Sequence, residues 1–286
     1  MKFTKMQGAG NDFVVVAAGK KKPDWSRLAI AMCDRHYGIG ADGVLLVSTS
    51  RTADCAMRVF NSDGTEAEAC GNGTRCLVKY VADNGLVPAG AEEITIATLA
   101  GIRKARVHRS SGKVTSVTVA MGKPAFSAGD IPVIIESGQG SISKTKSMIN
   151  CTINIDGQKL ALNLVSMGNP HAVCFAPNPV ADFPLLVLGP KVERHVIFPK
   201  RANFEIVRVL NRKEIEARVW ERGAGETLAC GSGACAIAVA GQLLGYVDSE
   251  VSVKLPGGTL QVAWDGTGEV FLSGPAEIVF SGEWPD

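Results

Sequence analysis

Short runs of β-branched and aromatic residues recur along the chain, and Gly, Asn and Asp residues separate them. This spacing is typical of strands joined by tight turns. The predicted strands of the first half are 13–17, 44–48, 55–60, 93–98, 102–108 and 114–121. Those of the second half are 149–155, 159–166, 172–175, 204–210, 214–220, 250–255, 258–264 and 269–273. A last run at 276–280 has no place in this pattern, and no strand is predicted before Gly8.

Four segments follow a helical pattern instead. Segments 26–36 and 73–83 are closed by Gly38 and Gly85, and glycine is a common helix terminator. Two further helices are predicted at 184–194 and 233–244. Many short strands with few helices predict an α+β fold.

One cysteine motif occurs twice. Cys70-Gly71-Asn72-Gly73 is echoed by Cys230-Gly231-Ser232-Gly233, and an apolar helical run follows both. The match continues outward at nearly the same offset, with 57–61 on 217–221, 42–47 on 202–207 and 10–15 on 168–173. A match that extends in this way indicates an internal duplication.

The duplication and the length of 286 residues predict two domains. Residues 1–123, completed by a C-terminal strand within 275–286, form the first, and residues 124–274 form the second. The Gly- and Pro-containing segment 123–147 is the predicted linker. We expect two pseudo-symmetric domains, each a curled, mostly antiparallel, barrel-like sheet around a central helix, with the active site in the cleft between them.

Composition and charge narrow the class of protein. A net charge of +2 with scattered basic clusters, such as Lys20-Lys21-Lys22, argues against a nucleic-acid partner. No run has the length of a signal peptide or a membrane span, so we expect a cytoplasmic protein with no membrane partner. The eight cysteines are then expected to be reduced, and their spacing does not suggest a zinc site, so no metal is expected.

Two glycine-rich stretches resemble nucleotide-binding motifs. Segment 38–43 has the spacing G-x-G-x-x-G, but a predicted helix precedes it and a strand follows, which reverses the order of a dinucleotide site. Segment 8–12 lacks the third glycine. No lysine has a recognisable pyridoxal-phosphate context, so we expect no cofactor.

The two cysteines are the first candidates for chemistry. A cysteine at a helix start lies where outward-pointing backbone N–H groups favour the thiolate. Cys70 and Cys230 could be small core residues, a redox or metal pair, or catalytic thiols. Two copies beside exposed N–H groups favour an anion site flanked by reactive thiols. A matched acid and base suits inversion of a carbon next to a carboxylate, because one group removes a proton and the other returns one on the opposite face.

Further polar residues stand at matched positions of the repeat. His171 occupies the position of Phe13, which favours a place near the site, with a packed histidine as the alternative. Glu221 and Arg222 could face a zwitterionic ligand or form a surface ion pair. Asparagines at the ends of hydrophobic strands offer both a donor and an acceptor, as an amino-acid ligand requires. They are Asn11, Asn61, Asn72, Asn169 and Asn203.

Longer motifs run through both halves of the chain. They are Gly8-Ala9-Gly10-Asn11-Asp12-Phe13, Arg35-x-x-Gly38-Ile39-Gly40-x-Asp42, Phe60-Asn61-x-Asp63-Gly64, Cys70-Gly71-Asn72-Gly73-x-Arg75-Cys76, Met167-Gly168-Asn169-Pro170-His171, Phe198-Pro199-x-Arg201-x-Asn203 and Glu221-Arg222-Gly223-x-Gly225-Glu226-Thr227-x-Ala229-Cys230-Gly231-x-Gly233. Together these motifs are highly specific. By them the chain resembles the diaminopimelate epimerases over essentially its whole length.

The resemblance implies an isomerase without a cofactor, which interconverts LL- and meso-diaminopimelate in lysine and cell-wall precursor biosynthesis. It implies that Cys70 and Cys230 transfer the α-proton as thiolate and thiol, with His171 and Glu221 beside them. By the same resemblance, backbone amides at Gly71-Asn72 and Gly231-Ser232 hold the reacting carboxylate. The residues implied for the distal amino-acid end are Asn11, Asn61, Asn169, Asn203, Glu221 and Arg222.

Two further points follow from the resemblance. Some members carry a glutamine just after the position of Asp42, whereas this chain has Gly43, so a side-chain contact there is absent or replaced. The last strand, 276–280, is implied to return to the first domain.

Two alternatives stay open at this point. One is a racemase of another amino acid on the same fold, which the set of distal-end residues disfavours. The other is a non-catalytic ligand-binding protein in which Cys70 and Cys230 form a reversible disulfide. The expected partners are a small amino-acid substrate and a second copy of the chain in a homodimer.

Overall fold

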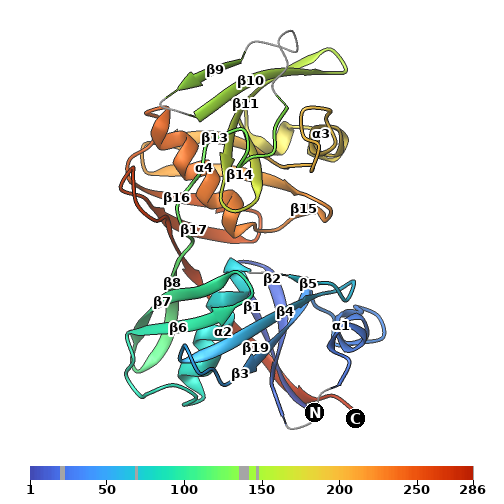
Figure 1. The fold of residues 1–286 in the computed structure, drawn as a ribbon, viewed down its shortest axis with the longest axis vertical. Helices are drawn as coiled ribbons and strands as arrows, with labels where there is room; N and C mark the ends of the chain where they lie inside the picture. The colour runs from blue at the N-terminus through green and yellow to red at the C-terminus, as the bar shows by residue number, and fades with distance from the viewer. Residues whose placement is uncertain (20–22, 68–69, 135–141, 146–147, 286) are drawn as a thin grey trace. The chain divides into compact units, whose positions relative to one another are not determined.

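The computed structural model describes residues 1–19, 23–67, 70–134, 142–145 and 148–285 (Figure 1). They fall into two compact units, Met1–Ala120 with Ser273–Asp286, and Met121–Leu272. The basic cluster 20–22, Ala69 and part of the predicted linker lie outside the described residues. Whether each half folds as a separate domain stays a prediction.

The first unit is built of short strands around one helix. Its strands are β1 (Lys2–Gly8), β2 (Asn11–Ala17), β3 (Gly43–Ser48), β4 (Cys55–Asn61), β5 (Glu66–Ala67), β6 (Glu93–Thr98), β7 (Gly101–Ser110), β8 (Lys113–Ala120) and β19 (Glu277–Glu283), and its helices are α1 (Trp25–Cys33) and α2 (Gly71–Asp83). Most neighbouring strands are antiparallel, but β2 pairs with β3 and β4 with β6 in parallel.

The second unit repeats this plan. Its strands are β9 (Ile142–Thr145), β10 (Met148–Ile155), β11 (Gln158–Ser166), β12 (Pro170–Phe175), β13 (Asn203–Asn211), β14 (Glu214–Glu221), β15 (Gly225–Thr227), β16 (Glu250–Leu255) and β17 (Gly258–Ala263). Its helices are η1 (Val180–Asp182), α3 (Leu185–Glu193) and α4 (Gly231–Leu243), and β18 (Phe271–Pro275) crosses from this unit into the first. The parallel pairs β12–β13 and β14–β16 correspond to β2–β3 and β4–β6.

The register makes the correspondence specific. Phe13 stands opposite Gly43 in the first unit, and His171 stands opposite Asn203 in the second. Two residues further along each pair, Val15 is opposite Leu45, and Val173 is opposite Glu205. The duplication read from the sequence is therefore present in the strand pairing.

Each unit buries a helix that begins with a cysteine motif. In α4 the residues from Gly233 to Gly241 are all buried, and most are Ala, Val or Gly, so the strands can approach the helix closely on all sides. In α2 the buried residues include Arg75, whose Nε donates to the carbonyl oxygen of Pro275 over 3.2 Å. That contact ties α2 to the C-terminal segment.

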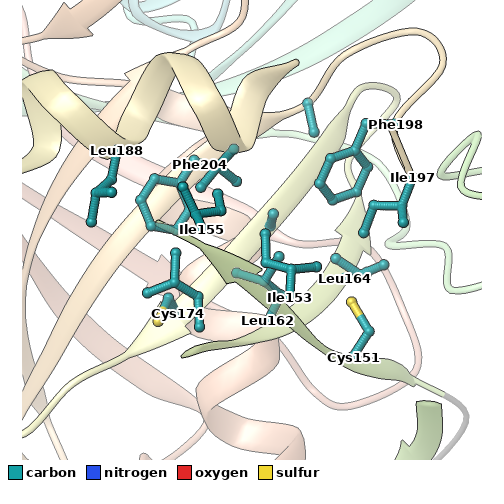
Figure 2. Packing of buried hydrophobic residues seen from close by; sticks show 14 of the residues in the cluster. Cys151, Ile153, Ile155, Leu162, Leu164, Cys174, Leu188, Ile197, Phe198 and Phe204 are labelled. Carbon is teal, nitrogen blue, oxygen red and sulfur yellow. The ribbon is translucent and has the colours of Figure 1, made fainter. Parts of the chain in front are cut away.

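A second core lies on the other face of the sheet in the second unit. Figure 2 shows Phe204 and Leu188 facing Ile155 and the neighbouring side chains of β10 to β12, and Phe198 and Ile197 extend the cluster. Leu188 belongs to α3, which contacts β13, β14 and β15. The strand β13 therefore has α4 on one side and α3 on the other.

The structure corrects several sequence expectations. A strand, β1, does precede Gly8, although none was predicted there. Helix α1 ends at Cys33, before the predicted end, because the Asp34 carboxylate accepts hydrogen bonds from the amides of His36 and Tyr37, both at 2.7 Å. The predicted linker contains strand β9, which pairs with β10. The last strand, β19, pairs with β1 along its length.

None of the helices in the described ranges is both long enough and apolar enough to cross a membrane.

Candidate functional site

In the first unit, Cys70 is the N-cap of α2. Its backbone is extended, with φ −145° and ψ 114°, and its Sγ accepts a hydrogen bond from the amide of Gly73 over 3.3 Å. The Cys70 carbonyl oxygen accepts from the amide and the hydroxyl group of Thr74, both at 2.8 Å. As the N-cap residue, Cys70 lies at the positive end of the helix dipole. The residue is partly exposed.

Two of the predicted binding asparagines meet beside this helix start. Asn72 donates to the Oδ1 of Asn11 over 3.1 Å, and Asn11 donates to the Oδ2 of Asp42 over 2.6 Å. Asp42 in turn accepts from Arg35 at 2.8 Å, and Arg35 also holds Asp12 through two hydrogen bonds. The orientation of Asn11 is thus fixed from both ends.

Asp12 anchors this network to the core. Lys5, itself buried, lies 2.7 Å from the Asp12 carboxylate and also donates to the carbonyl oxygen of Gly40. Burial acts to raise the pKa of Asp12, but the hydrogen bonds from Arg35 and Lys5 outweigh it and lower that pKa below its ordinary value. Asp12 therefore stays charged and keeps the network closed.

Two other predicted positions in this unit behave differently. Asn61 ends β4, is exposed, and donates through Nδ2 to the hydroxyl of Thr65 over 2.9 Å, within its own turn. The hydrogen bonds that join Asn11 and Asn72 to each other and to Asp42 do not include Asn61. At Gly43 an added Cβ would lie 2.7 Å from the carbonyl oxygen of Phe60, so the tight β3–β4 pairing leaves no room for a side chain at this position.

In the second unit, Cys230 is the N-cap of α4 in the same way. Its backbone is extended, with φ −115° and ψ 115°, and its Sγ accepts from the amide of Gly233 over 3.4 Å. The hydroxyl group of Ser232 lies 3.6 Å from the sulfur. Unlike Cys70, Cys230 is buried, with 5% of its surface exposed.

His171 is fully buried near this helix start. Its Nδ1 is hydrogen-bonded to Oε1 of Glu205 at 2.6 Å, and its Nε2 to Oδ1 of Asn169 at 3.0 Å. Asn169 donates through Nδ2 to the hydroxyl of Ser232 over 3.3 Å. A continuous series of hydrogen bonds therefore runs from Glu205 through His171 and Asn169 to Ser232, whose hydroxyl group lies near the sulfur of Cys230.

Asn203 and the Glu221–Arg222 turn form the rest of this group. Asn203 donates to the carbonyl oxygen of Pro170 over 2.9 Å and accepts from the amide of Arg222 over 2.9 Å. Glu221 accepts from the hydroxyl of Thr227 over 2.5 Å, whereas the Arg222 guanidinium donates to the Lys200 carbonyl oxygen. The two side chains have separate partners, and Glu221 is the last residue of β14.

Burial is the largest influence on the pKa values of Cys230 and Glu205. Burial raises the pKa of the Cys230 thiol well above its ordinary value, and the nearby carboxyl groups of Glu221 and Glu205 add to the effect, while Ser232 and the Gly233 amide oppose it. Burial likewise raises the pKa of Glu205, against the lowering effect of His171. These effects favour the thiol form of Cys230 at neutral pH.

Sequence reasoning missed three groups that hold the predicted residues in place. These are Glu205, the Asp12–Arg35–Asp42 network, and Glu193, which accepts hydrogen bonds from Trp220 Nε1 at 2.8 Å and from the Gly223 amide at 3.0 Å. One signal was available for Glu205, because it is the only charged residue within the apolar run 204–207 and stands where the first repeat has Leu45. Within the described ranges, no three His, Cys, Asp or Glu side chains form a group that could hold a metal ion.

The fold has counterparts among solved structures. The crystal structure of a probable proline racemase from Agrobacterium radiobacter K84 superposes with a TM-score of 0.72, over 99% of this chain and 92% of that one, at 15% identity. At this identity the likeness concerns the fold alone. The chain thus has a mostly-β α+β fold that is also found in a probable racemase.

Sequence comparison is more specific. The sequence profile described as diaminopimelate epimerase matches residues 3–127 and 163–279. The diaminopimelate epimerase of Desulfovibrio desulfuricans is 46% identical over 287 residues, which are 99% of this chain and 98% of that protein. That of Pelotomaculum thermopropionicum is 45% identical over 288 residues, or 100% and 99% of the two chains. This chain belongs to the diaminopimelate epimerase family, which confirms the resemblance seen in its motifs.

Proposed function

We propose that this protein interconverts LL- and meso-diaminopimelate without a cofactor, with Cys70 and Cys230 as the two groups that move the α-proton. The observation that carries the proposal is the paired cysteine caps. Each cysteine starts a buried helix, and each Sγ accepts a hydrogen bond from the amide of the glycine three residues on, at 3.3 Å for Gly73 and 3.4 Å for Gly233. Membership of the family supplies the substrate.

The chemistry requires one base and one acid. In the proposed reaction a thiolate removes the proton from the α-carbon, and the thiol of the other cysteine delivers a proton to the opposite face. The first cysteine ends the turnover as a thiol and the second as a thiolate, so the reverse reaction uses the same groups in exchanged roles. Protons and charge balance without any further reactant.

The negative charge that develops on the substrate needs stabilisation, because a carbon bearing an ammonium and a carboxylate group is a weak acid. Backbone N–H groups at a helix start are fixed donors that do not have to reorganise during the reaction. Those near Gly71-Asn72 and Gly231-Ser232 belong to the first turns of α2 and α4. We assign the reacting carboxylate to these amides.

The distal amino-acid end would be read by the asparagines and the Glu221–Arg222 turn. Asn11 and Asn72 are pre-oriented through Asp42, and Asn203 is pre-oriented through Pro170 and Arg222. Fixed donors and acceptors bind a polar ligand at a lower entropic cost than mobile ones. Because a smaller amino acid would leave such groups unsatisfied, we propose diaminopimelate as the preferred substrate.

The mechanism needs both cysteines in the reduced form. We therefore place the protein in a reducing compartment and propose the cytoplasm.

The test of substrate identity is incubation of the purified, reduced protein with LL-diaminopimelate and with a panel of single-centre amino acids, including proline. Chiral chromatography follows the stereochemistry of each. We expect meso-diaminopimelate to form and the single-centre amino acids to keep their configuration. Inversion of another amino acid at a comparable kcat/KM would favour the racemase alternative, and an absence of turnover with and without reductant would favour a non-catalytic binder.

A further inference from the structure

The two units differ at one pair of buried positions. In the first unit, Phe13 on β2 and Leu45 on β3 are both fully apolar and buried. In the second unit the equivalent residues are His171 on β12 and Glu205 on β13, and neither has any exposed side-chain surface. The strands, their pairing and their register are otherwise alike, so the polar pair is a substitution within a common scaffold.

The first unit has the same strand pairing without a polar pair at these positions. Burying an ionisable pair costs desolvation free energy, and apolar residues of similar volume often serve as well or better. The first unit is a direct example, because Phe13 and Leu45 fill the same place there. The cost in the second unit therefore points to a functional role.

The carboxyl group of Glu205 is incompletely satisfied. Its Oε1 is hydrogen-bonded to His171, but no hydrogen bond of normal geometry reaches Oε2 from any described residue, although the backbone amide of Ala172 lowers the pKa of the group. An ionised carboxylate would keep one bare oxygen in a dry environment. The surroundings thus favour a proton on the pair.

Glu205 also lies close to the sulfur of Cys230. A Cβ built on Gly233 would be 3.2 Å from Oε1 of Glu205 and 3.4 Å from Sγ of Cys230, so the carboxyl group and the sulfur approach the same point on α4. The first unit has Leu45 in this place, 2.9 Å from the Cβ built on Gly73. The glycine at the helix start makes room for the carboxyl group.

The hydrogen-bond directions show where the protons lie along the contacts from Glu205 to Ser232. Asn169 donates through Nδ2 to Ser232, so its Oδ1 must accept from Nε2 of His171. His171 then carries a proton on Nε2, and one more proton lies between its Nδ1 and Glu205. The pair is neutral as a whole, whichever of the two atoms binds that proton.

We propose that Glu205 is a positioning residue of the reaction, which orients His171 through Nδ1 and holds the side chain of Cys230 as the thiol. The role of Glu205 in the reaction rests on the proposed function. Its effect on the protonation of Cys230 does not, because that effect is a property of the protein without substrate. Where it is charged, the Glu205 carboxylate opposes a second negative charge on the sulfur of Cys230.

The groups that face Glu205 come from three elements. They are His171 on β12, Glu221 at the end of β14 and Cys230 at the start of α4. Burial raises the pKa of Glu205, and its interaction with Glu221 acts in the same direction. Both carboxyl groups act to raise the pKa of Cys230, so removing the charge of Glu205 alone should lower it in part.

The direct test is the pH dependence of alkylation of Cys230 by iodoacetamide in the substrate-free protein, followed by mass spectrometry of its peptide. For Glu205→Gln we expect the midpoint to move to lower pH by about one pH unit, because one nearby negative charge is removed. The matched control is Glu216→Gln on β14, whose carboxylate binds Arg208 and the amide of Val180. It should leave the midpoint of Cys230 unchanged.

Turnover in both directions gives the second readout. We expect Glu205→Leu, which copies the first unit, to lower kcat roughly ten- to hundredfold with little change in KM, because His171 loses its orienting partner. Glu205→Gln, whose amide can still hydrogen-bond to Nδ1, should recover part of this loss. If Glu205→Gln fails to fold, Glu205→Asp replaces it, and its retained charge should keep the alkylation midpoint of Cys230 high.

Three results would overturn the proposal. They are an unchanged Cys230 midpoint in a folded Glu205→Gln protein, an equal shift in Glu216→Gln, or wild-type kcat in Glu205→Leu. A wild-type protein without epimerase activity would refute the proposed function, whereas the alkylation result would still decide the effect of Glu205 on Cys230.

Discussion

Cys70 and Cys230 occupy equivalent helix caps but different surroundings. Cys70 is partly exposed, whereas Cys230 is buried and faces the carboxyl groups of Glu205 and Glu221. A pair of groups that exchanges roles during a reaction does not have to start from equal states. The polar pair of the second unit gives a physical reason for a difference between the two thiols.

The other cysteines provide a prediction about reactivity. Burial raises the pKa of Cys33 and of Cys76 to about 12, and the pKa values of Cys55, Cys151 and Cys174 to about 11. At about pH 8 only roughly a thousandth or less of each is thiolate, the form that reacts. We expect these five peptides to stay unmodified after brief treatment of the native protein with iodoacetamide.

The control for this prediction is the same treatment in denaturant, which should modify all five cysteines. Rapid modification of any of them in the native protein would show that its surroundings open readily to solvent, contrary to the buried positions described for them.

Among the elements, α3 shows how packing fixes the turn that carries Glu221. Gly189 lies against the ring of Trp220, and a Cβ there would be 2.6 Å from Cδ2 and 2.7 Å from Cγ. The ring cannot move freely, because its Nε1 donates to Glu193 over 2.8 Å. Glu193 also accepts from the Gly223 amide, so helix, ring and turn form one packed unit.

Gly189→Ala is therefore expected to lower the free energy of unfolding by about 1–3 kcal/mol, as overpacking of a core does. Denaturant titration measures the change. The matched control is Gly129→Ala in the same unit, whose added Cβ would meet only Ser127 Oγ, at 3.8 Å, and which should have an effect close to zero. Equal stability of the two variants would contradict the packing described for α3.

The elements also show what the sequence can and cannot predict. Strands β10 to β14 follow from their apolar runs, and the capped starts of α2 and α4 follow from the repeated cysteine motif. Strand β1 is hard to recognise in the sequence because its apolar residues alternate with lysines and a threonine. One of its partners, β2, follows directly in the chain, but the other, β19, lies at the far end and leaves no local signal.

The same limit applies to the site. The motifs and the resemblance pointed to Cys70, Cys230, His171 and the asparagines, because their positions recur in both halves. The sequence around Glu205 indicates only a strand, because the role of this residue depends on a contact with His171 across two parallel strands. The repeat alignment held the clue, because a buried leucine had been replaced by a charged residue.

At the scale of the whole molecule, the chain does not divide at a single point. Residues Ser273–Asp286 belong to the first unit, where β19 pairs with β1 and the N-terminal amine of Met1 donates to the Trp284 carbonyl oxygen over 2.6 Å. The rings of Phe3 and Phe280 also meet edge to face at 5.9 Å. The C-terminal strand is thus a structural part of the N-terminal unit.

A chain that ends after Pro275 should therefore lose order in the first unit and keep it in the second. We expect hydrogen exchange in β1 and β2 to rise at least roughly tenfold, since the edge of β1 and the side chain of Phe3 become exposed. Exchange in β10 to β14 should stay close to that of the full chain. A uniform rise across both units would contradict this division of the chain.

The central claim is proton transfer by two different groups, and a single experiment in deuterated water tests it most directly. LL-diaminopimelate is incubated with the enzyme in D₂O, and the isotope content of substrate and product is measured by mass spectrometry during the first few per cent of conversion. Two thiols predict a meso product with deuterium at the inverted carbon and a remaining substrate that is still largely protonated. Equal early labelling of substrate and product would mean that one group both removes and returns the proton, and it would contradict the account.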